Sequence, residues 1–331
     1  MKALILNEGQ RAPVLLDAPD PVPAAGEALV RLEAAALNHR DVYITQGKYP
    51  GIVHPAILGS DGCGVVEAVT DGDAAWVGRR VVINPSLSWG PNPEVQGPDF
   101  SILGMPSHGT LAERIAIPVT NLQPAPDHLT SQEAAALPLA GLTAWRALMT
   151  RAGLRSGERV LVTGIGGGVA LFALQFAVAS GAEVWVTSSD PGKIERARAL
   201  GAQGGALYTD EGWSKQLQQM APAGFDVIID SAGGAGFGAL VRLLAMGGRL
   251  AFYGGTRGKW PEILPQHLFF KQVSILASTM GSPSDFEAMV RFVAQHEIRP
   301  VVDGIYDLSQ AAEGFARLSE GAQFGKVVFT V

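Results

Sequence analysis

A glycine-rich turn follows a short apolar run near the middle of the chain. Residues 159–163 form the run, and residues 164–170 (GIGGGVA) form the turn. Small residues let a pyrophosphate approach the backbone N–H groups at the start of a helix, where the helix dipole favours negative charge. A helical stretch and a second apolar run from Glu183 follow, as a dinucleotide-binding βαβ unit requires. We predict that the pyrophosphate lies against Gly166, Gly167, Gly168 and Val169; the alternative is a glycine loop that only packs a helix on a sheet.

The end of the second run indicates which dinucleotide is bound. It closes on Ser188 and Ser189, and the first carboxylate, Asp190, comes too late to take a ribose 2′-hydroxyl. Hydroxyls followed by Lys193 suit a 2′-phosphate better. The pattern therefore favours NADP (NADPH) over NAD. The alternative is that both serines only cap the helix that begins at Pro191.

Further cofactor contacts are predicted at the ends of later strands, because ligands collect beyond the carboxyl ends of parallel strands. Gly254, Gly255 and Thr256 follow a strand that ends at Tyr253, and we expect them near the nicotinamide ribose. The residues expected to flank the nicotinamide are Thr143 and Ser278.

The elements that must position these residues change character along the chain. Short alternating runs at residues 2–6, 14–18, 28–34, 65–69, 80–83 and 113–117, separated by Pro and Gly, indicate a compact β barrel or sandwich. Residues 86–109 are typical of a long loop. Helical patterns follow at 131–137 and 143–151, the first with a capping box from Thr130 to Glu133.

A strict alternation of strands and helices occupies the next part of the chain. Fully apolar runs alternate with amphipathic stretches such as 194–200 and 240–245, which predicts a parallel sheet covered on both faces. We expect the C-terminal residues 325–331 to rejoin the first domain. The predicted strands are residues 160–163, 184–187, 227–230, 249–253 and 273–277.

Composition excludes several classes of protein. The 331 residues suffice for about two domains. With 47% hydrophobic and 17% charged residues and a net charge of −6, the chain is globular and lacks the basic stripe that nucleic acids require. No apolar stretch reaches the roughly 20 residues that cross a bilayer, and the N-terminus does not resemble a signal peptide. We expect a cytoplasmic protein without a membrane partner.

Several segments together resemble the medium-chain dehydrogenase/reductase superfamily, and within it the zinc-free quinone oxidoreductase group. The resemblance runs from end to end. It implies an α/β protein with a doubly wound Rossmann sheet at residues 122–294 and a GroES-like β-barrel catalytic domain formed by residues 1–121 and 295–331, with the active-site cleft between them. The matching segments are 37–41 (LNHRD), 47–50 (GKYP), 58–64 (LGSDGCG), 139–145 (LAGLTAW) and 160–181.

The resemblance also implies that no zinc is bound. In zinc-dependent relatives the catalytic ligands match Asn38, Ser60 and Leu139 here, and none of these is a useful ligand. The four-cysteine lobe of those enzymes would fall near residues 86–106, yet Cys63 is the one cysteine of the chain. Without a Lewis acid to lower an alcohol's pKa, we expect reduction of an electrophilic substrate.

Asn38, Tyr43 and Tyr49 are implied to line the substrate pocket. An amide and two phenols can hydrogen-bond a quinone or enone oxygen and stabilise the charge that develops as hydride arrives. Five positions place Asn38 and Tyr43 about 140° apart on a helix, so one face need not carry both. The alternatives are a core aromatic for Tyr43, a packed loop residue for Tyr49 and a helix cap for Asn38. His39 and Asp41 are helix neighbours that do not share a face, so we do not pair them.

The leading hypothesis is a zinc-independent, NADPH-dependent reductase of quinones or α,β-unsaturated carbonyls (enones). Two alternatives remain open: an enoyl thioester reductase, and a non-enzymatic NADPH-binding protein of the zeta-crystallin type. The resemblance implies a homodimer, because in this superfamily the last strand of the Rossmann sheet often pairs across a twofold axis, and residues 273–277 are the apolar edge that can do so. The physiological substrate is not indicated by the sequence.

Overall fold

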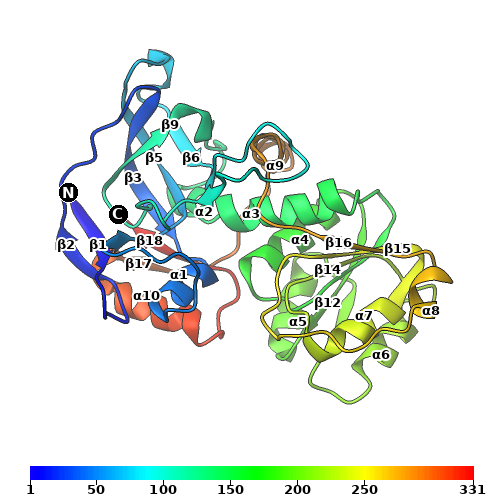
Figure 1. The fold of residues 1–331 in the computed structure, drawn as a ribbon. Helices are drawn as coiled ribbons and strands as arrows, with labels where there is room; N and C mark the ends of the chain where they lie inside the picture. Colours follow the sequence, from blue (N-terminus) through cyan, green and yellow to red (C-terminus); the bar gives the residue numbers. More distant parts are fainter. The chain divides into compact units, whose positions relative to one another are not determined.

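The computed structural model describes all 331 residues and divides them into two compact units (Figure 1). The first comprises Met1–Leu142 and Gly281–Val331, and the second Thr143–Met280. These boundaries differ from the predicted 121/122 and 294/295. Packing explains the difference: β10 (Leu122–Pro124) pairs with β6 (Arg80–Ile83), and Met289 of α9 (Pro283–Gln295) lies against Gly141.

The first unit is built on a seven-stranded sheet in which β3 is central. Its order is β10-β6-β5-β3-β18-β17, with β9 also paired to β3. β18 runs antiparallel to β3 and parallel to β17, so the C-terminal residues rejoin the first unit as predicted. The strands not yet bounded are β3 (Glu27–Ala36), β5 (Asp61–Val69), β9 (Arg114–Pro118), β17 (Val302–Asp307) and β18 (Lys326–Thr330).

Alternation of apolar and polar residues explains why β3 forms and which face it buries. Ala28, Val30 and Leu32 are buried, and their neighbours on the other face are partly or fully exposed. These three side chains pack against apolar residues of β5, β6 and β9 in one core cluster. Backbones approach closely here, because a side chain on Gly64 would clash with the carbonyl oxygen of Arg31.

Smaller elements complete the first unit. A second sheet has the order β2-β1-β4, and β7 and β8 form a short pair inside the predicted loop 86–109. A second core cluster joins β1, α1, α10 and β18. The bounds are β1 (Lys2–Leu6), β2 (Val14–Asp17), β4 (Ala56–Ile57), β7 (Ser86–Leu87), β8 (Ser101–Ile102), α1 (His39–Thr45), α2 (Ser131–Ala135) and α10 (Ala311–Ser319).

The second unit contains a six-stranded parallel sheet of order β13-β12-β11-β14-β15-β16. This order, 3-2-1-4-5-6 along the unit, is that of a Rossmann fold. The central strands β11 and β14 are almost completely buried, which explains their continuous apolar sequence. The strands are β11 (Arg159–Val162), β12 (Glu183–Ser188), β13 (Gly204–Leu207), β14 (Phe225–Asp230), β15 (Leu244–Phe252) and β16 (Ser274–Ala277).

The helices of the second unit differ from the prediction in two places. The predicted helix 240–245 is split, because α7 ends at Leu243 and β15 begins at Leu244. The predicted helix 143–151 is the end of α3 (Pro138–Trp145) followed by a π-helical segment, Arg146–Arg151. The remaining helices are α4 (Gly168–Ala179), α5 (Pro191–Ala199), α6 (Trp213–Met220), α7 (Phe237–Leu243) and α8 (Gln266–Phe269).

Candidate active site

Asn38, Asp61 and Lys326 meet at one end of the main sheet of the first unit. Asn38 is the N-cap residue of α1, two positions after β3, whereas Asp61 begins β5 and Lys326 begins β18. Both strands are neighbours of β3, and Ala36 is in register with Asp61 on one side and with Val328 on the other. The strand order therefore brings together three residues that are far apart in sequence.

The three side chains form a closed hydrogen-bonded cluster. Lys326 Nζ donates to Asn38 Oδ1 and to Asp61 Oδ2, each at 2.7 Å. Asn38 Nδ2 donates to the same Asp61 oxygen at 2.9 Å, and the backbone N–H of Leu139 donates to Asp61 Oδ1 at 2.7 Å. The exposed fractions of Asn38, Asp61 and Lys326 are 7%, 0% and 4%. Asn38 thus occupies the cap position, but its amide turns into this cluster.

Arg40 positions the second predicted residue, Tyr49. Its Nε donates to the Tyr49 hydroxyl at 3.2 Å, and its guanidinium carbon lies 4.8 Å from the ring centroid. The other guanidinium nitrogens donate to Ser60 Oγ at 2.6 Å and to carbonyl oxygens that include that of Leu103, at 2.7 Å. The Tyr49 ring also packs against the core cluster of α1 and α10. Sequence analysis missed the role of Arg40.

Tyr43, the third predicted pocket residue, is not part of this arrangement. It is half-buried, and its hydroxyl hydrogen-bonds to neither Asn38 nor Tyr49. Asp41 has a structural role, since its carboxylate accepts from the backbone N–H groups of Asn38 at 2.8 Å and Gly59 at 3.2 Å. Burial raises the pKa of Asp41. The structure therefore agrees with leaving Asp41 out of the chemistry.

The predicted pyrophosphate turn lies at the carboxyl end of β11. Gly164 and Gly166 have φ values of 64° and 137°, which other residues rarely adopt, and Gly167 is the N-cap of α4. No side chain caps α4, and a Cβ on Gly167 would meet nothing within 4 Å. Open space therefore borders uncapped N–H groups, which fits a bound pyrophosphate.

The turn is held in place by neighbouring strand ends. Thr187 Oγ1 accepts from the backbone N–H of Gly164 at 3.1 Å. Thr163 Oγ1 donates to Asp230 Oδ1 at 2.6 Å, and Asp230 Oδ2 accepts from the backbone N–H of Gly233 at 2.8 Å. Asp230 is the last residue of β14, and sequence analysis gave it no role; its signal was a lone carboxylate at the end of an apolar strand.

The predicted 2′-phosphate residues lie at the end of β12 and the start of α5. Ser188 is 2% exposed and Ser189 is exposed. Asp190 Oδ1 accepts from the backbone N–H of Gly192 at 2.8 Å, so Asp190 rather than the serines caps α5.

Two residues that sequence analysis missed lie near this strand end. The backbone N–H of Tyr208, one residue after β13, donates to the carbonyl oxygen of Ser188 at 2.9 Å. Arg257 places its guanidinium carbon 5.2 Å from the Tyr208 ring centroid, which brings a second cation besides Lys193 to this edge of the sheet.

The remaining predicted cofactor residues follow β15 and β16. A Cβ on Gly254 would lie 2.5 Å from the carbonyl oxygen of Ser231, whereas Gly255 borders open space. The backbone N–H of Ser278 donates to the carbonyl oxygen of Phe252 at 2.9 Å. The buried Oγ of Ser278 has no hydrogen-bond partner. Such an orphaned hydroxyl fits a bound group that supplies the partner. Thr143 is 6% exposed, and Thr256, after Gly255, is exposed.

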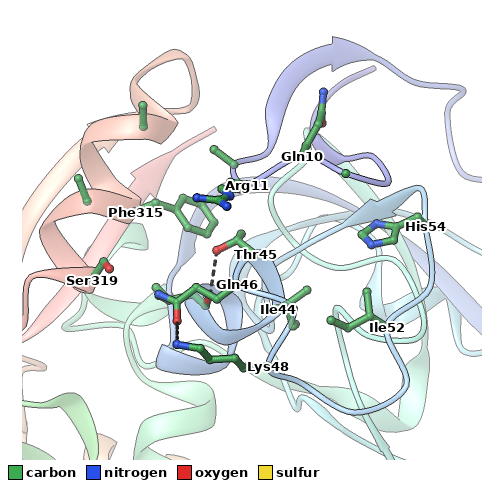
Figure 2. Close-up of a pocket in the computed structure, with 16 residues that line it drawn as sticks. Gln10, Arg11, Ile44, Thr45, Gln46, Lys48, Ile52, His54, Phe315 and Ser319 are labelled. Atoms are coloured by element: carbon green, nitrogen blue, oxygen red, sulfur yellow. Dashed lines mark hydrogen bonds between the residues drawn. The ribbon is translucent and has the colours of Figure 1, made fainter.

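A separate concavity of about 740 Å³ lies at the other end of α1 (Figure 2). The last turn of α1, the β1–β2 connection and α10 line it. Arg11, Lys48 and His54 are its basic residues, and Lys48 Nζ donates to Gln46 Oε1 at 3.0 Å. Asn38 and Tyr49 are not among its lining residues. The concavity is therefore distinct from the cluster at the first turn of α1.

Comparison with known proteins identifies the family. Residues 24–127 match the alcohol dehydrogenase GroES-like domain, and residues 168–295 match the zinc-binding dehydrogenase family. A zinc-type alcohol dehydrogenase-like protein, YogA, of Leptosphaeria maculans is 38% identical, with 94% of this chain and 92% of the relative covered. The chain belongs to the medium-chain dehydrogenase/reductase superfamily.

Two further members of the superfamily are similar over their whole length. The acryloyl-coenzyme A reductase of Metallosphaera sedula is 30% identical, and all of both chains is covered. The crystal structure of an NAD-dependent alcohol dehydrogenase is 39% identical, with a TM-score of 0.92 and full coverage of both chains. The predicted superfamily and the combination of a Rossmann sheet with a GroES-like domain are thus confirmed, and this member is an oxidoreductase.

The family description implies zinc, so the residues at the ligand positions must be tested for it. Asn38 offers an amide whose oxygen already accepts from Lys326, and Leu139 has no donor side chain. Ser60 Oγ accepts from Arg40 and donates to the Leu103 carbonyl at 2.7 Å. The carboxylate of Asp61 accepts from Lys326, Asn38 and the backbone N–H of Leu139. This donor set does not fit zinc in this dehydrogenase/reductase.

No helix in the structure combines the length and the apolar character needed to cross a membrane.

Proposed function

We propose that this dehydrogenase/reductase reduces α,β-unsaturated carbonyl compounds, with enoyl thioesters as the preferred class. The observation that carries the proposal is the fixed amide of Asn38. Its Oδ1 accepts from Lys326 and one Nδ2 hydrogen goes to Asp61, so the second Nδ2 hydrogen is the donor that remains for a ligand. A donor suits a carbonyl oxygen that gains negative charge as the substrate accepts hydride.

Tyr49 is the proposed proton donor for the reduced substrate. Its hydroxyl oxygen accepts from Arg40 Nε, which leaves the phenolic hydrogen available to donate. Arg40 is itself fixed by Ser60 and Leu103, so the phenol has little freedom to turn away. Asn38 and Tyr49 would therefore supply one hydrogen bond to the carbonyl oxygen and one proton.

NADPH is the proposed cofactor, and when bound its reduced nicotinamide supplies the hydride. Gly167 and the uncapped start of α4 would hold the pyrophosphate. Lys193 and Arg257 would neutralise the 2′-phosphate, and the exposed hydroxyl of Ser189 would bind one of its oxygens, whereas the Oγ of buried Ser188 accepts from the backbone N–H of Asp190 at 3.1 Å. Ser278 Oγ would gain its missing partner from the nicotinamide end.

Enoyl thioesters replace quinones as the first choice of substrate. Sequence analysis put quinones and enones first and enoyl thioesters second. The full-length similarity to an acryloyl-coenzyme A reductase favours the second of these. Quinones remain compatible with the amide and phenol, because they too accept hydride beside an oxygen that becomes negative.

The test is a turnover panel with the purified protein. Binding of NADPH and NADH is measured by calorimetry, followed by NADPH oxidation with crotonyl-coenzyme A, a simple enone and 1,4-benzoquinone, with and without EDTA. We expect turnover of the thioester that EDTA does not change. Tight NADPH binding without reduction of any acceptor would support a binding protein, and zinc-dependent alcohol oxidation would support an alcohol dehydrogenase; either result contradicts the proposal.

We further propose a homodimer that forms through β16. This strand ends the parallel sheet, and Ile275 and Leu276 in it are only half-buried. An open apolar edge can pair with a second copy across a twofold axis. Sedimentation at micromolar concentration should give a mass of two chains, and a single-chain mass would contradict the dimer.

A further inference from the structure

We propose that Lys326 is a positioning residue whose buried ammonium replaces the positive charge of a metal ion. It would fix the amide of Asn38 so that Nδ2–H, and never Oδ1, faces the substrate carbonyl. The inference rests on the proposed function, because it assigns the group that orients the hydrogen-bond donor of that site.

The donor chemistry of lysine fixes the orientation of the Asn38 amide. An ammonium has three hydrogens to donate and no acceptor, whereas an asparagine amide can present either its oxygen or its nitrogen. With Nζ 2.7 Å from Asn38 Oδ1, a flipped amide would set two donors against each other. Asp61 imposes the same orientation from the other side, because its Oδ2 accepts from Nδ2 at 2.9 Å.

Burial strengthens the electrostatic interactions of Lys326. Lys326 is 4% exposed and Asp61 0%, so their ion pair at 2.7 Å acts in a medium of low effective dielectric constant. Hydrogen bonding of Oδ1 to a cation withdraws electron density from the amide and strengthens Nδ2–H as a donor. The neighbouring carboxylate of Asp41 does not compete, since the N–H groups of Asn38 and Gly59 occupy it.

The positive charge of Lys326 lies close to residues at the zinc-ligand positions. Asn38 and Leu139, which match catalytic zinc ligands in relatives, both contact Asp61, and Asp61 contacts Lys326. The ammonium of Lys326 is therefore hydrogen-bonded directly to Asn38, the side chain expected to bind the substrate oxygen. Electrostatic stabilisation of a developing oxyanion needs such a preorganised charge, whether it is a metal ion or an ammonium.

A purely structural role is the competing explanation, because the cluster also ties β18 to β5 and to the start of α1. Removing Lys326 alone would leave Asp61 as a buried uncompensated charge and could unfold the protein. The key variant is therefore the double substitution Lys326→Met with Asp61→Asn, which removes both charges. Lys326→Arg keeps the charge and its donors.

The experiment records the infrared carbonyl band of a ¹³C-labelled crotonyl thioester bound with NADP⁺, a complex that cannot transfer hydride. In the wild type we expect the band to move to lower wavenumber than in solution. In the double variant we expect this shift to be lost and kcat to fall about 10- to 100-fold, as for other groups that orient a reactive ligand. KM, NADPH affinity and melting temperature should change little, and Lys326→Arg should restore part of the shift.

The outcomes separate the inference from the proposed function. A wild type that neither reduces the thioester nor shifts its carbonyl band contradicts the proposed function. If the folded double variant keeps both the wild-type band shift and the wild-type kcat, the role of Lys326 is overturned while the proposed function stands. If methionine prevents folding, Lys326→Gln with Asp61→Asn removes the same charges with a polar side chain, and an unchanged shift there overturns the inference equally.

Discussion

The guanidinium of Arg40 lies over the ring of Tyr49 and donates through Nε to the Tyr49 hydroxyl at 3.2 Å. Arg40 and Tyr49 come from opposite ends of the α1 region, and Ser60 and Leu103 hold the guanidinium between them. The contact therefore fixes a phenol within the unit that contains Asn38. In this contact the phenolic oxygen accepts a hydrogen bond, so the phenolic hydrogen remains available to donate.

Tyr49→Phe should lower kcat for thioester reduction by about 100-fold, within the range of about 10² to 10⁴ that general acids contribute. The ring remains, so its packing and the contact with the Arg40 side chain are kept. Steady-state kinetics and the melting temperature are the measurements.

Tyr43→Phe is the matched control, because Tyr43 is half-buried and its hydroxyl contacts neither Asn38 nor Tyr49. Its kcat should stay within about twofold of the wild type. Equal losses in both variants would remove Tyr49 from the mechanism.

Gly167→Ala should weaken NADPH and NADH binding together while leaving the melting temperature unchanged. A Cβ at this position meets no protein atom within 4 Å, and φ is −79°, so the folded chain tolerates it. The methyl group would instead intrude on the bound pyrophosphate. Calorimetry and thermal unfolding measure the two effects.

Gly164→Ala gives the opposite result on stability. Its φ of 64° imposes a cost of roughly 1–2 kcal/mol on any residue with a Cβ, so the melting temperature should fall. If Gly167→Ala binds both nucleotides as the wild type does, the pyrophosphate does not lie at this turn.

Lys193→Glu should weaken NADPH binding far more than NADH binding, because only NADPH carries the 2′-phosphate that the lysine would neutralise. Lys215→Glu is the control, since it makes the same charge change on exposed α6. The ratio of the two dissociation constants is the relevant quantity. An equal loss for both nucleotides at Lys193 would argue against a 2′-phosphate contact.

Cys63 should make the fold less stable in alkaline solution. Burial raises the pKa of its thiol from 9.0 to about 12. Between these values the unfolded chain has lost a proton that the folded chain retains, so stability falls as pH rises above 9, by about 1.4 kcal/mol per pH unit. Below pH 9 the thiol has no effect.

Cys63→Ala should therefore flatten the fall of stability in denaturant titrations at pH 8 to 10.5. The comparison uses the slope with pH, because the smaller side chain also lowers the absolute stability by leaving a cavity. Burial also raises the pKa of Tyr253, and both proteins contain this residue, so it cancels. Identical slopes would contradict the prediction.

The sequence by itself determined the nucleotide-binding part of this protein. The strand, the glycine turn and the helix of residues 159–179 are consecutive, so their chemistry can be read from local patterns. The capping box of Thr130 and Glu133 was predicted for the same reason, and both of its hydrogen bonds are present. The strand order of the sheet was not part of the prediction, and the predicted strands did not include β13.

The tertiary structure alone determined the cluster of Asn38, Asp61 and Lys326. Lys326 and Asn38 are 288 positions apart, and no local pattern marks a lysine at the start of the last strand as a partner of the first helix. They meet because β18 and β5 both pair with β3, and long-range strand pairing depends on the whole core rather than on neighbouring residues. Arg40, Tyr208 and Arg257 were missed for the same reason. Their contacts depend on packing between segments that are distant in sequence, and local sequence patterns do not predict such packing.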